Sequence, residues 1–203
     1  MFELLTKGGV VMIPIGICSI VALAIIIERF WSLRSQLIIP KQEIKRIEFL
    51  VTQGKLNEAI EACQFNSGNS SYRKIILSGL DNAGEKRHII KEVVEEAGRQ
   101  EVVYLERYLT MLGTIASITP LLGLLGTVLG MIKVFTTISS VGVGDPSVLA
   151  SGIGESLITT AAGLTVAIPT VSFHRYFNRL IDRHVVALER SALIVIDHIK
   201  SGH

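Results

Sequence analysis

Three long runs with almost no charge constrain this sequence more than any other feature. They cover residues 10–27, 108–132 and 146–174, and only the last is interrupted by an acidic residue, Glu155. An α-helix rises about 1.5 Å per residue, so runs of this length match the hydrocarbon core of a bilayer, which is about 30 Å thick. Three membrane-spanning helices are therefore predicted.

The composition agrees with a chain that alternates between two solvents. Hydrophobic residues make up 49% and charged residues 19% of the sequence, whereas soluble domains carry about 25% charged residues. The region between Glu28 and Arg107 has the mixed charge of a water-exposed domain. A cleaved signal peptide is the alternative for the first run, but no small-residue cleavage site follows it. The net charge of +2 gives no indication of nucleic-acid binding.

Basic residues near the ends of the runs predict the orientation, because cytoplasmic flanks carry the excess of Lys and Arg. Only Lys7 precedes the first run, the segment 139–150 contains no basic residue, and clusters follow the first and third runs. The N-terminus and that segment are therefore expected outside. The predicted organisation is an outer N-terminus (1–9), spans at 10–30, 109–138 and 148–174, a cytoplasmic helical domain (31–108), an outer loop (139–147) and a cytoplasmic C-terminal helix (175–203).

The cytoplasmic parts show helical periodicity. Apolar residues recur every three or four positions on both sides of Gly54, which predicts a helical hairpin, and residues 66–71 are expected to form a loop. From about Lys86 the periodicity indicates one helix that continues without a break into the second span. In the tail, apolar residues form a heptad seam that packs either on this chain's own helices or between subunits. The seam consists of Ile181, Val185, Leu188, Ala192, Val195 and Ile199.

Glu155 is the main candidate functional residue. A helix that starts near Pro146 places it at least two turns inside the third span, toward the outer half of the membrane. A charged side chain at that depth costs at least about 2.5 kcal/mol unless it has a polar partner. Desolvation favours the protonated form of a carboxyl, which suits a group that takes up and releases protons. The alternatives are a Glu155 that reaches the headgroups or that holds a hydrogen bond between helices.

Hydroxyl and small residues surround this candidate. Thr159 lies about 40° from Glu155 around a straight helix, whereas Thr160 lies about 140° away, so spacing favours Thr159 on the same face. Single hydroxyls in membrane helices often bond only to the carbonyl four residues earlier. In the second span, small residues predict close helix packing, and one proline in each of the last two spans predicts a kink. These packing and kink candidates are Gly123, Gly126, Gly130, Pro120 and Pro169.

Two segments resemble the MotA/TolQ/ExbB family of bacterial proton channels, and within it ExbB and TolQ most. They are Pro120 to Gly130, PLLGLLGTVLG, and Gly152 to Pro169, GIGESLITTAAGLTVAIP. The opening MFEL, the segment VMIP and the pair Glu28-Arg29 are also similar to the N-termini of ExbB-type proteins. The resemblance covers nearly the whole chain.

The resemblance implies an all-α membrane protein that assembles as a pentamer around a central lumen. In such a channel the lumen holds two helices of a single-span partner similar to ExbD or TolR, whose Asp lies near the channel's polar residues. By motif position, Glu155 matches the essential membrane Glu, Thr160 the lumen Thr of the third span, and Thr127 that of the second. Thr159 stands where relatives often have Ala. The motif match therefore favours Thr160 as the lumen residue, whereas the helical spacing favours Thr159.

The function that follows is that of a proton-channel stator subunit in the inner membrane of a Gram-negative bacterium, with the outer side in the periplasm. It would energise outer-membrane transport through a TonB-like protein, without being an enzyme and without a cofactor or metal. The alternatives are a TolQ-type subunit that maintains the outer membrane through a TolA-like protein, and a non-conducting membrane scaffold. A substrate-binding transporter is disfavoured, because the spans are few and no internal repeat is found.

Overall fold

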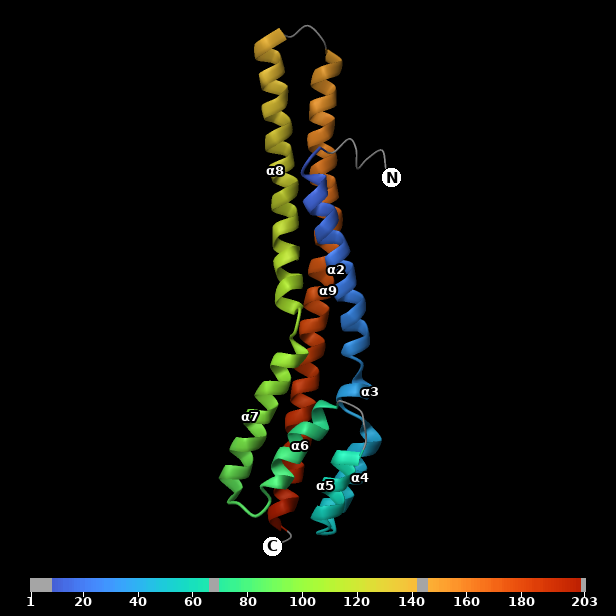
Figure 1. Cartoon of the computed structure of the whole chain (residues 1–203), viewed down its shortest axis with the longest axis vertical. Coiled ribbons are helices and arrows are strands. Elements are labelled where there is room, and N and C mark those ends of the chain that lie inside the picture. Colours follow the sequence, from blue (N-terminus) through green and yellow to red (C-terminus); the bar gives the residue numbers. More distant parts are fainter. Residues whose placement is uncertain (1–8, 66–69, 142–145, 202–203) are drawn as a thin grey trace. The chain divides into compact units, whose positions relative to one another are not determined.

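The computed structural model describes residues 9–65, 70–141 and 146–201 (Figure 1). All regular elements within these ranges are α-helices, as the sequence predicts. In chain order they are α2 (Met12–Ser32), α3 (Ser35–Ile38), α4 (Lys41–Thr52), α5 (Leu56–Phe65), α6 (Ser71–Asp81), α7 (Arg87–Leu105), α8 (Leu109–Val141) and α9 (Pro146–Ser201).

The helices form two compact units. Unit 1 comprises Met1–Glu28 and Tyr108–Tyr176, and unit 2 comprises Arg29–Arg107 and Phe177–His203, so that α2 and α9 contribute residues to both. Three stretches are long and apolar enough to cross a membrane: Met12–Ser32, Arg87–Ser139 and Leu149–Ile199. The all-helical class with three candidate membrane-spanning helices therefore matches the expectation from the sequence.

Unit 1 has apolar side chains on its outside. In Figure 1, α8 and the first part of α9 run side by side, with α2 next to α9. Ile20 on α2 is 72% exposed, Leu121 on α8 is 62% exposed and Ile168 on α9 is 64% exposed. An apolar outer surface of this kind is unfavourable in water and suits a bilayer.

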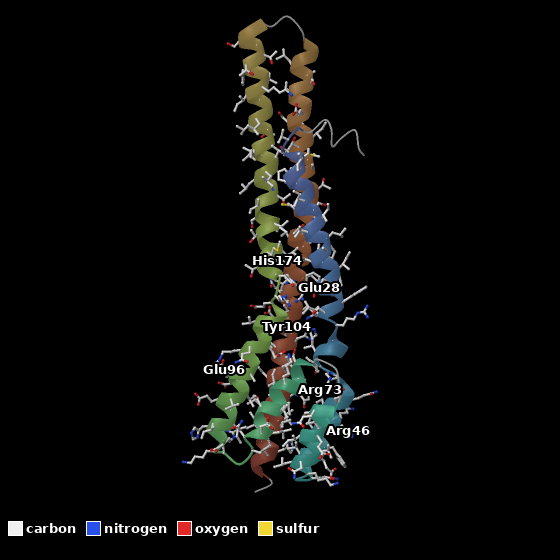
Figure 2. All side chains as sticks on the ribbon, in the orientation of Figure 1. Glu28, Arg46, Arg73, Glu96, Tyr104 and His174 are labelled. Atoms are coloured by element: carbon white, nitrogen blue, oxygen red, sulfur yellow. The ribbon has the colours of Figure 1, made fainter. Side chains whose placement is uncertain are left out.

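Unit 2 has its apolar side chains inside. Its core includes Ile47, Ile76 and Ile90, which are at most 1% exposed, and the fully buried ring of Phe177. Charged side chains such as Arg46 and Glu96 point outward (Figure 2). This is the arrangement of a domain that folds in water, because burial of apolar surface drives its packing.

The heptad seam of the tail packs within the chain itself. Ile181, Leu188, Ala192, Val195 and Ile199 are all buried, and Val185 is half-buried. Most of the seam therefore packs on this chain's own helices, which is the first of the two arrangements expected from the sequence.

The expected continuous helix from Lys86 into the second span is wrong. α7 ends at Leu105, α8 begins at Leu109, and Tyr108 between them has a positive φ of 65°. The buried guanidinium of Arg29 donates a hydrogen bond to the carbonyl oxygen of Leu105 over 3.0 Å, which satisfies one of the terminal carbonyls that a continuing helix would have bonded. A residue 76 positions away therefore supports this helix end.

The hairpin around Gly54 is confirmed. Gly54 has a φ of +72°, a conformation that glycine adopts without strain, and it separates α4 from α5. Residues 66–69 of the expected loop lie outside the described residues, and α6 already begins at Ser71. The two cysteines, Cys18 in unit 1 and Cys63 in unit 2, are both free thiols.

Candidate functional site

Glu155 lies inside α9, as the sequence predicts. The helix begins at Pro146, whose fixed φ and missing N–H suit the first turn, so Glu155 is more than two turns from the start. The expected N-cap, Asp145, lies outside the described residues. The side chain of Glu155 is 24% exposed, and its surroundings are provided by α8 and by the segment before α2.

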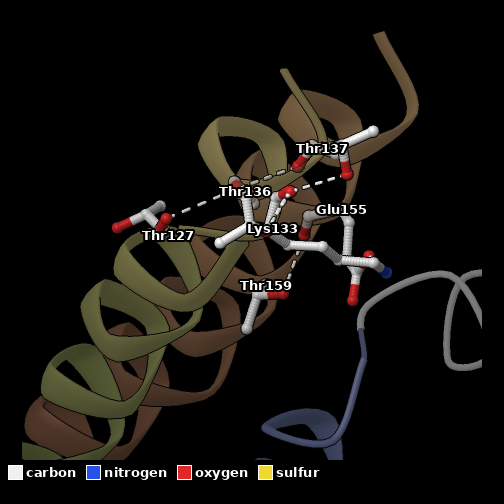
Figure 3. Close-up of polar contacts among 8 residues, drawn as sticks. Thr127, Lys133, Thr136, Thr137, Glu155 and Thr159 are labelled. Atoms are coloured by element: carbon white, nitrogen blue, oxygen red, sulfur yellow. Dashed lines mark hydrogen bonds and ion pairs between the residues drawn. The ribbon is translucent and has the colours of Figure 1, made fainter. Parts of the chain in front are cut away.

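Lys133 of α8 is the ion-pair partner of Glu155. Its Nζ lies 2.9 Å from Oε2 of the carboxylate, within both hydrogen-bond and salt-bridge distance (Figure 3). The pairing follows from the antiparallel course of the two helices, because Lys133 lies eight residues before the end of α8 at Val141 and Glu155 lies nine residues after Pro146. Lys133 directly follows the second uncharged run of the sequence, and this symmetric spacing could have identified the pair.

Gly9 covers the other side of the carboxylate. It has a φ of +66°, and a Cβ built on it would overlap Oε1 of Glu155. Its carbonyl oxygen accepts the N–H of Met12 over 3.2 Å, in the turn that leads into α2. A side chain at position 9 would therefore be disfavoured twice, by the backbone conformation and by the carboxylate.

Each of the three candidate threonines donates a hydrogen bond to a main-chain carbonyl oxygen. The hydroxyl of Thr159 donates to the carbonyl oxygen of Glu155 over 2.8 Å, and that of Thr127 donates to Leu124 over 2.6 Å. Thr160 differs, because its hydroxyl crosses to α8 and donates to the carbonyl oxygen of Gly123 over 3.1 Å. Figure 3 shows Thr127 pointing away from Glu155.

Thr159 and Thr160 therefore occupy different places in the packing. Thr159 is 1% exposed, and its side chain fills the space that a Cβ on Gly126 would need. Thr160 is half-buried next to Gly123. Both residues contact α8 within this chain, and the assignment of one of them to a lumen stays a prediction.

The predicted glycine contacts of α8 are present. The Cβ position of Gly130 is blocked by the hydroxyl of Ser156, and that of Gly123 lies 3.2 Å from Cα of Thr160. Gly163 of α9 was not predicted from the sequence as a packing residue, yet its Cβ position lies 2.8 Å from the carbonyl oxygen of Thr119 and 3.1 Å from Cα of Gly123. Small residues on both helices thus allow the backbones to approach closely.

Pro120 and Pro169 lie inside α8 and α9, as expected. Each removes one backbone hydrogen bond from its helix. The kinks expected at these positions stay a prediction.

An ion pair between two apolar helices can respond to protons. Protonation of the carboxylate removes its charge and leaves the ammonium group of Lys133 without a partner, which is costly in a medium of low dielectric constant. No group of metal-ligating side chains is found within the described ranges. The described side chains thus form a charged pair between α8 and α9.

Three apolar helices, two of them joined by a charged pair, define a polytopic membrane protein that keeps ionisable groups between its helices. The chain belongs to the MotA/TolQ/ExbB proton channel family, whose sequence model matches residues 67–190. This match includes both Lys133 and Glu155.

Individual relatives agree with the family assignment. ExbB-like 1 of Synechocystis sp. is 36% identical over 80% of this chain and 64% of its own length. ExbB-like 3 of the same organism is 32% identical over 90% of this chain and 87% of its own length. The biopolymer transport protein exbB1 of Vibrio cholerae is 29% identical over 93% of this chain and 84% of its own length. The chain thus spans under two thirds of the first relative and most of the other two.

Proposed function

We propose that this chain is the channel-forming stator subunit of a proton-driven motor in the inner membrane, which energises outer-membrane transport through a TonB-like protein. The observation that carries the proposal is the charged Glu155 between apolar helices, inside the region that matches a proton channel family. Inserting a charge at such a position is costly. A charged residue found there is therefore expected to have a function.

In the proposed orientation the N-terminus and the segment between α8 and α9 face the periplasm, and unit 2 faces the cytoplasm. The excess of Lys and Arg after the first and third apolar runs supports this orientation. Protons would then pass Glu155 on their way to the cytoplasm. Each proton supplies about 2.3 kcal/mol per 100 mV of membrane potential, in addition to the contribution of the pH gradient.

The proposed assembly is a homopentamer around a lumen that holds two helices of an ExbD- or TolR-like partner. Apolar surface that this chain leaves uncovered supports oligomerisation. On unit 2, a cavity of about 690 Å³ lies between α6, α7 and α9, and two side chains in its lining, Val103 and Leu193, are 71% and 46% exposed. In unit 1, Thr127, Thr159 and Thr160 are the proposed hydroxyls beside the lumen.

A non-conducting scaffold is the second candidate. The specific observation in its favour is the Lys133–Glu155 pair, because a salt bridge between two helices can serve assembly alone. In that case Glu155 would orient helices without exchanging protons. A TolQ-type output through a TolA-like protein uses the same channel and differs only in what the motor drives.

The test is the replacement of Glu155 by Gln in cells that contain the full complex. We expect the variant to assemble with its single-span partner but to lose energised uptake, because an amide cannot exchange the proton. Envelope integrity measured in the same cells separates a TolQ-type from an ExbB-type output. Glu58→Gln, at an exposed carboxylate of α5, is the matched control and should keep both activities. Normal uptake and envelope integrity in Glu155→Gln would contradict the proposed role.

A further inference from the structure

We propose that Lys133 is the counter-ion of Glu155 and sets the pH range over which the channel works. Lys133 would be a positioning residue, which acts on protons only through the carboxylate that it holds. The inference rests on the proposed proton-channel function and adds to it a second charged residue on a different helix.

Lys133 and Glu155 are in direct contact. The ammonium Nζ lies 2.9 Å from Oε2, the distance expected for a charge-assisted hydrogen bond. Between the two partners the carboxylate is the better enclosed, with 24% of its side chain exposed against 67% for Lys133. Because the protein encloses most of the carboxylate, its attraction to Lys133 is screened less than that between two fully exposed charges.

The direction of the Lys133 side chain also supports the pairing. A lysine near the end of an apolar span ordinarily extends its stem toward the headgroups, where water hydrates the ammonium group. Lys133 instead crosses to α9 and ends on the carboxylate (Figure 3). The hydroxyls of Thr136 and Thr137 both donate to its backbone carbonyl oxygen over 2.9 Å.

Other groups also lie around Glu155. The other carboxylate oxygen, Oε1, lies next to Gly9, which has no side chain. From α9 itself the hydroxyl of Thr159 donates to the backbone carbonyl oxygen of Glu155. Within the described residues, Lys133 is therefore the charged group found in contact with the Glu155 carboxylate.

The pair gives a balanced sequence of proton steps. A proton from the outer side binds the carboxylate, which becomes neutral and releases the ammonium group of Lys133. When that proton moves on toward the cytoplasm, the carboxylate recovers its charge and the ion pair forms again. One proton enters and one leaves, while Lys133 keeps its own proton throughout.

The first experiment measures proton flux against outer pH in vesicles that contain the chain with its single-span partner. In Lys133→Met the carboxylate has lost the cation that it contacts, so the midpoint of the flux profile should move to higher pH. Lys133→Arg keeps the charge and should restore the wild-type profile. Lys55→Met removes an exposed lysine that pairs with Glu58 and should leave the profile unchanged.

The second experiment follows the carboxyl group directly and does not depend on flux. The infrared C=O stretching band of protonated Glu155, identified by its loss in Glu155→Gln, is titrated with pH in the assembled complex. The band should persist to higher pH in Lys133→Met than in the wild type or in Lys133→Arg.

The two experiments separate the inference from the proposed function. A wild-type complex without proton flux would overturn the channel, and the infrared titration would still decide whether Lys133 is the counter-ion. A conducting complex in which Lys133→Met matches the wild type in both profile and titration would overturn the role of Lys133 and leave the channel intact.

Discussion

The two units use apolar side chains in opposite ways. In unit 2, Ile47, Ile76 and Ile90 form a core from which water is excluded. In unit 1, large apolar residues such as Ile20 and Leu121 face outward, while glycine, serine and threonine fill the contact between α8 and α9. Burial of apolar surface drives packing in water, whereas in lipid the close approach of backbones and the bonding of polar groups replace it.

The ion pairs of the two units also lie in different surroundings. In unit 2, Lys74 pairs with Glu101 over 2.8 Å, and Lys74 is 44% exposed in a region rich in other charges. In unit 1, Lys133 and Glu155 pair among apolar helices. The pair in unit 2 is the better enclosed of the two, since Glu101 is 10% exposed against 24% for Glu155, and the pair in unit 1 is distinguished by its apolar surroundings.

The largest expected effect is on the core of unit 2. Ile90→Ala removes a side chain with 0% exposure and should lower the free energy of unfolding by about 2–5 kcal/mol, because it leaves a cavity. Ile20→Ala, on the outer face of unit 1, removes the same atoms but should cost far less in detergent or lipid. Thermal unfolding of the full chain measures both, and equal losses would contradict the contrast between the units.

Membrane insertion should instead depend on the outer face of unit 1 and not on that of unit 2. Leu23→Lys introduces a charge in the middle of α2, at a side chain that is 59% exposed, and should disfavour insertion by about 2.5–3.5 kcal/mol. Phe49→Lys, at a 61% exposed position of α4, should leave insertion unchanged because unit 2 is expected in water. The inserted fraction, measured by glycosylation mapping or protease protection, checks both variants. Indifference to Leu23→Lys would argue against a bilayer around unit 1.

Close packing in unit 1 should depend on single glycines. Gly163→Ala places a Cβ 2.8 Å from a backbone oxygen of Thr119, which cannot move aside easily, and should destabilise the chain by about 1–3 kcal/mol. Gly154→Ala on the same helix meets no atom within 4 Å and should be neutral or slightly stabilising. Melting temperatures in detergent measure the difference, and a harmless Gly163→Ala would remove the argument for close packing at this point.

The smallest effect concerns a buried histidine of unit 2. Burial lowers the pKa of His184, and the neighbouring Arg183 lowers it further, while a hydrogen bond to the carbonyl oxygen of Leu33 opposes this shift. A lowered folded-state pKa means that the unfolded chain takes up this proton first. The stability that neutral His184 contributes is therefore fully present above its pKa of about 6.5 in the unfolded chain, and it falls as the pH drops below that pKa.

The check for His184 is the melting temperature between pH 7.5 and pH 5 in detergent. His184→Gln cannot take up the proton, so it should lose less stability than the wild type over this range. A wild type and a variant with parallel pH dependence would remove this histidine from the account.

Features that depend on one helix were predictable from the sequence, because length, periodicity and hydropathy determine them. The apolar runs, the hairpin at Gly54 and the depth of Glu155 in its helix are examples. Features that depend on contacts between helices were not. The helix end at Leu105 relies on Arg29, and the site around Glu155 relies on Lys133 and on Gly9, so their geometry becomes visible only when separate segments meet.

The most direct test of the central claim is proton flux in vesicles that contain the purified chain, with and without its single-span partner. The account predicts that the complex conducts protons down an imposed gradient and that Glu155→Gln abolishes this flux while the complex still assembles. An assembled wild-type complex without flux, or one whose flux persists in Glu155→Gln, would contradict the claim that Glu155 lies on a proton path.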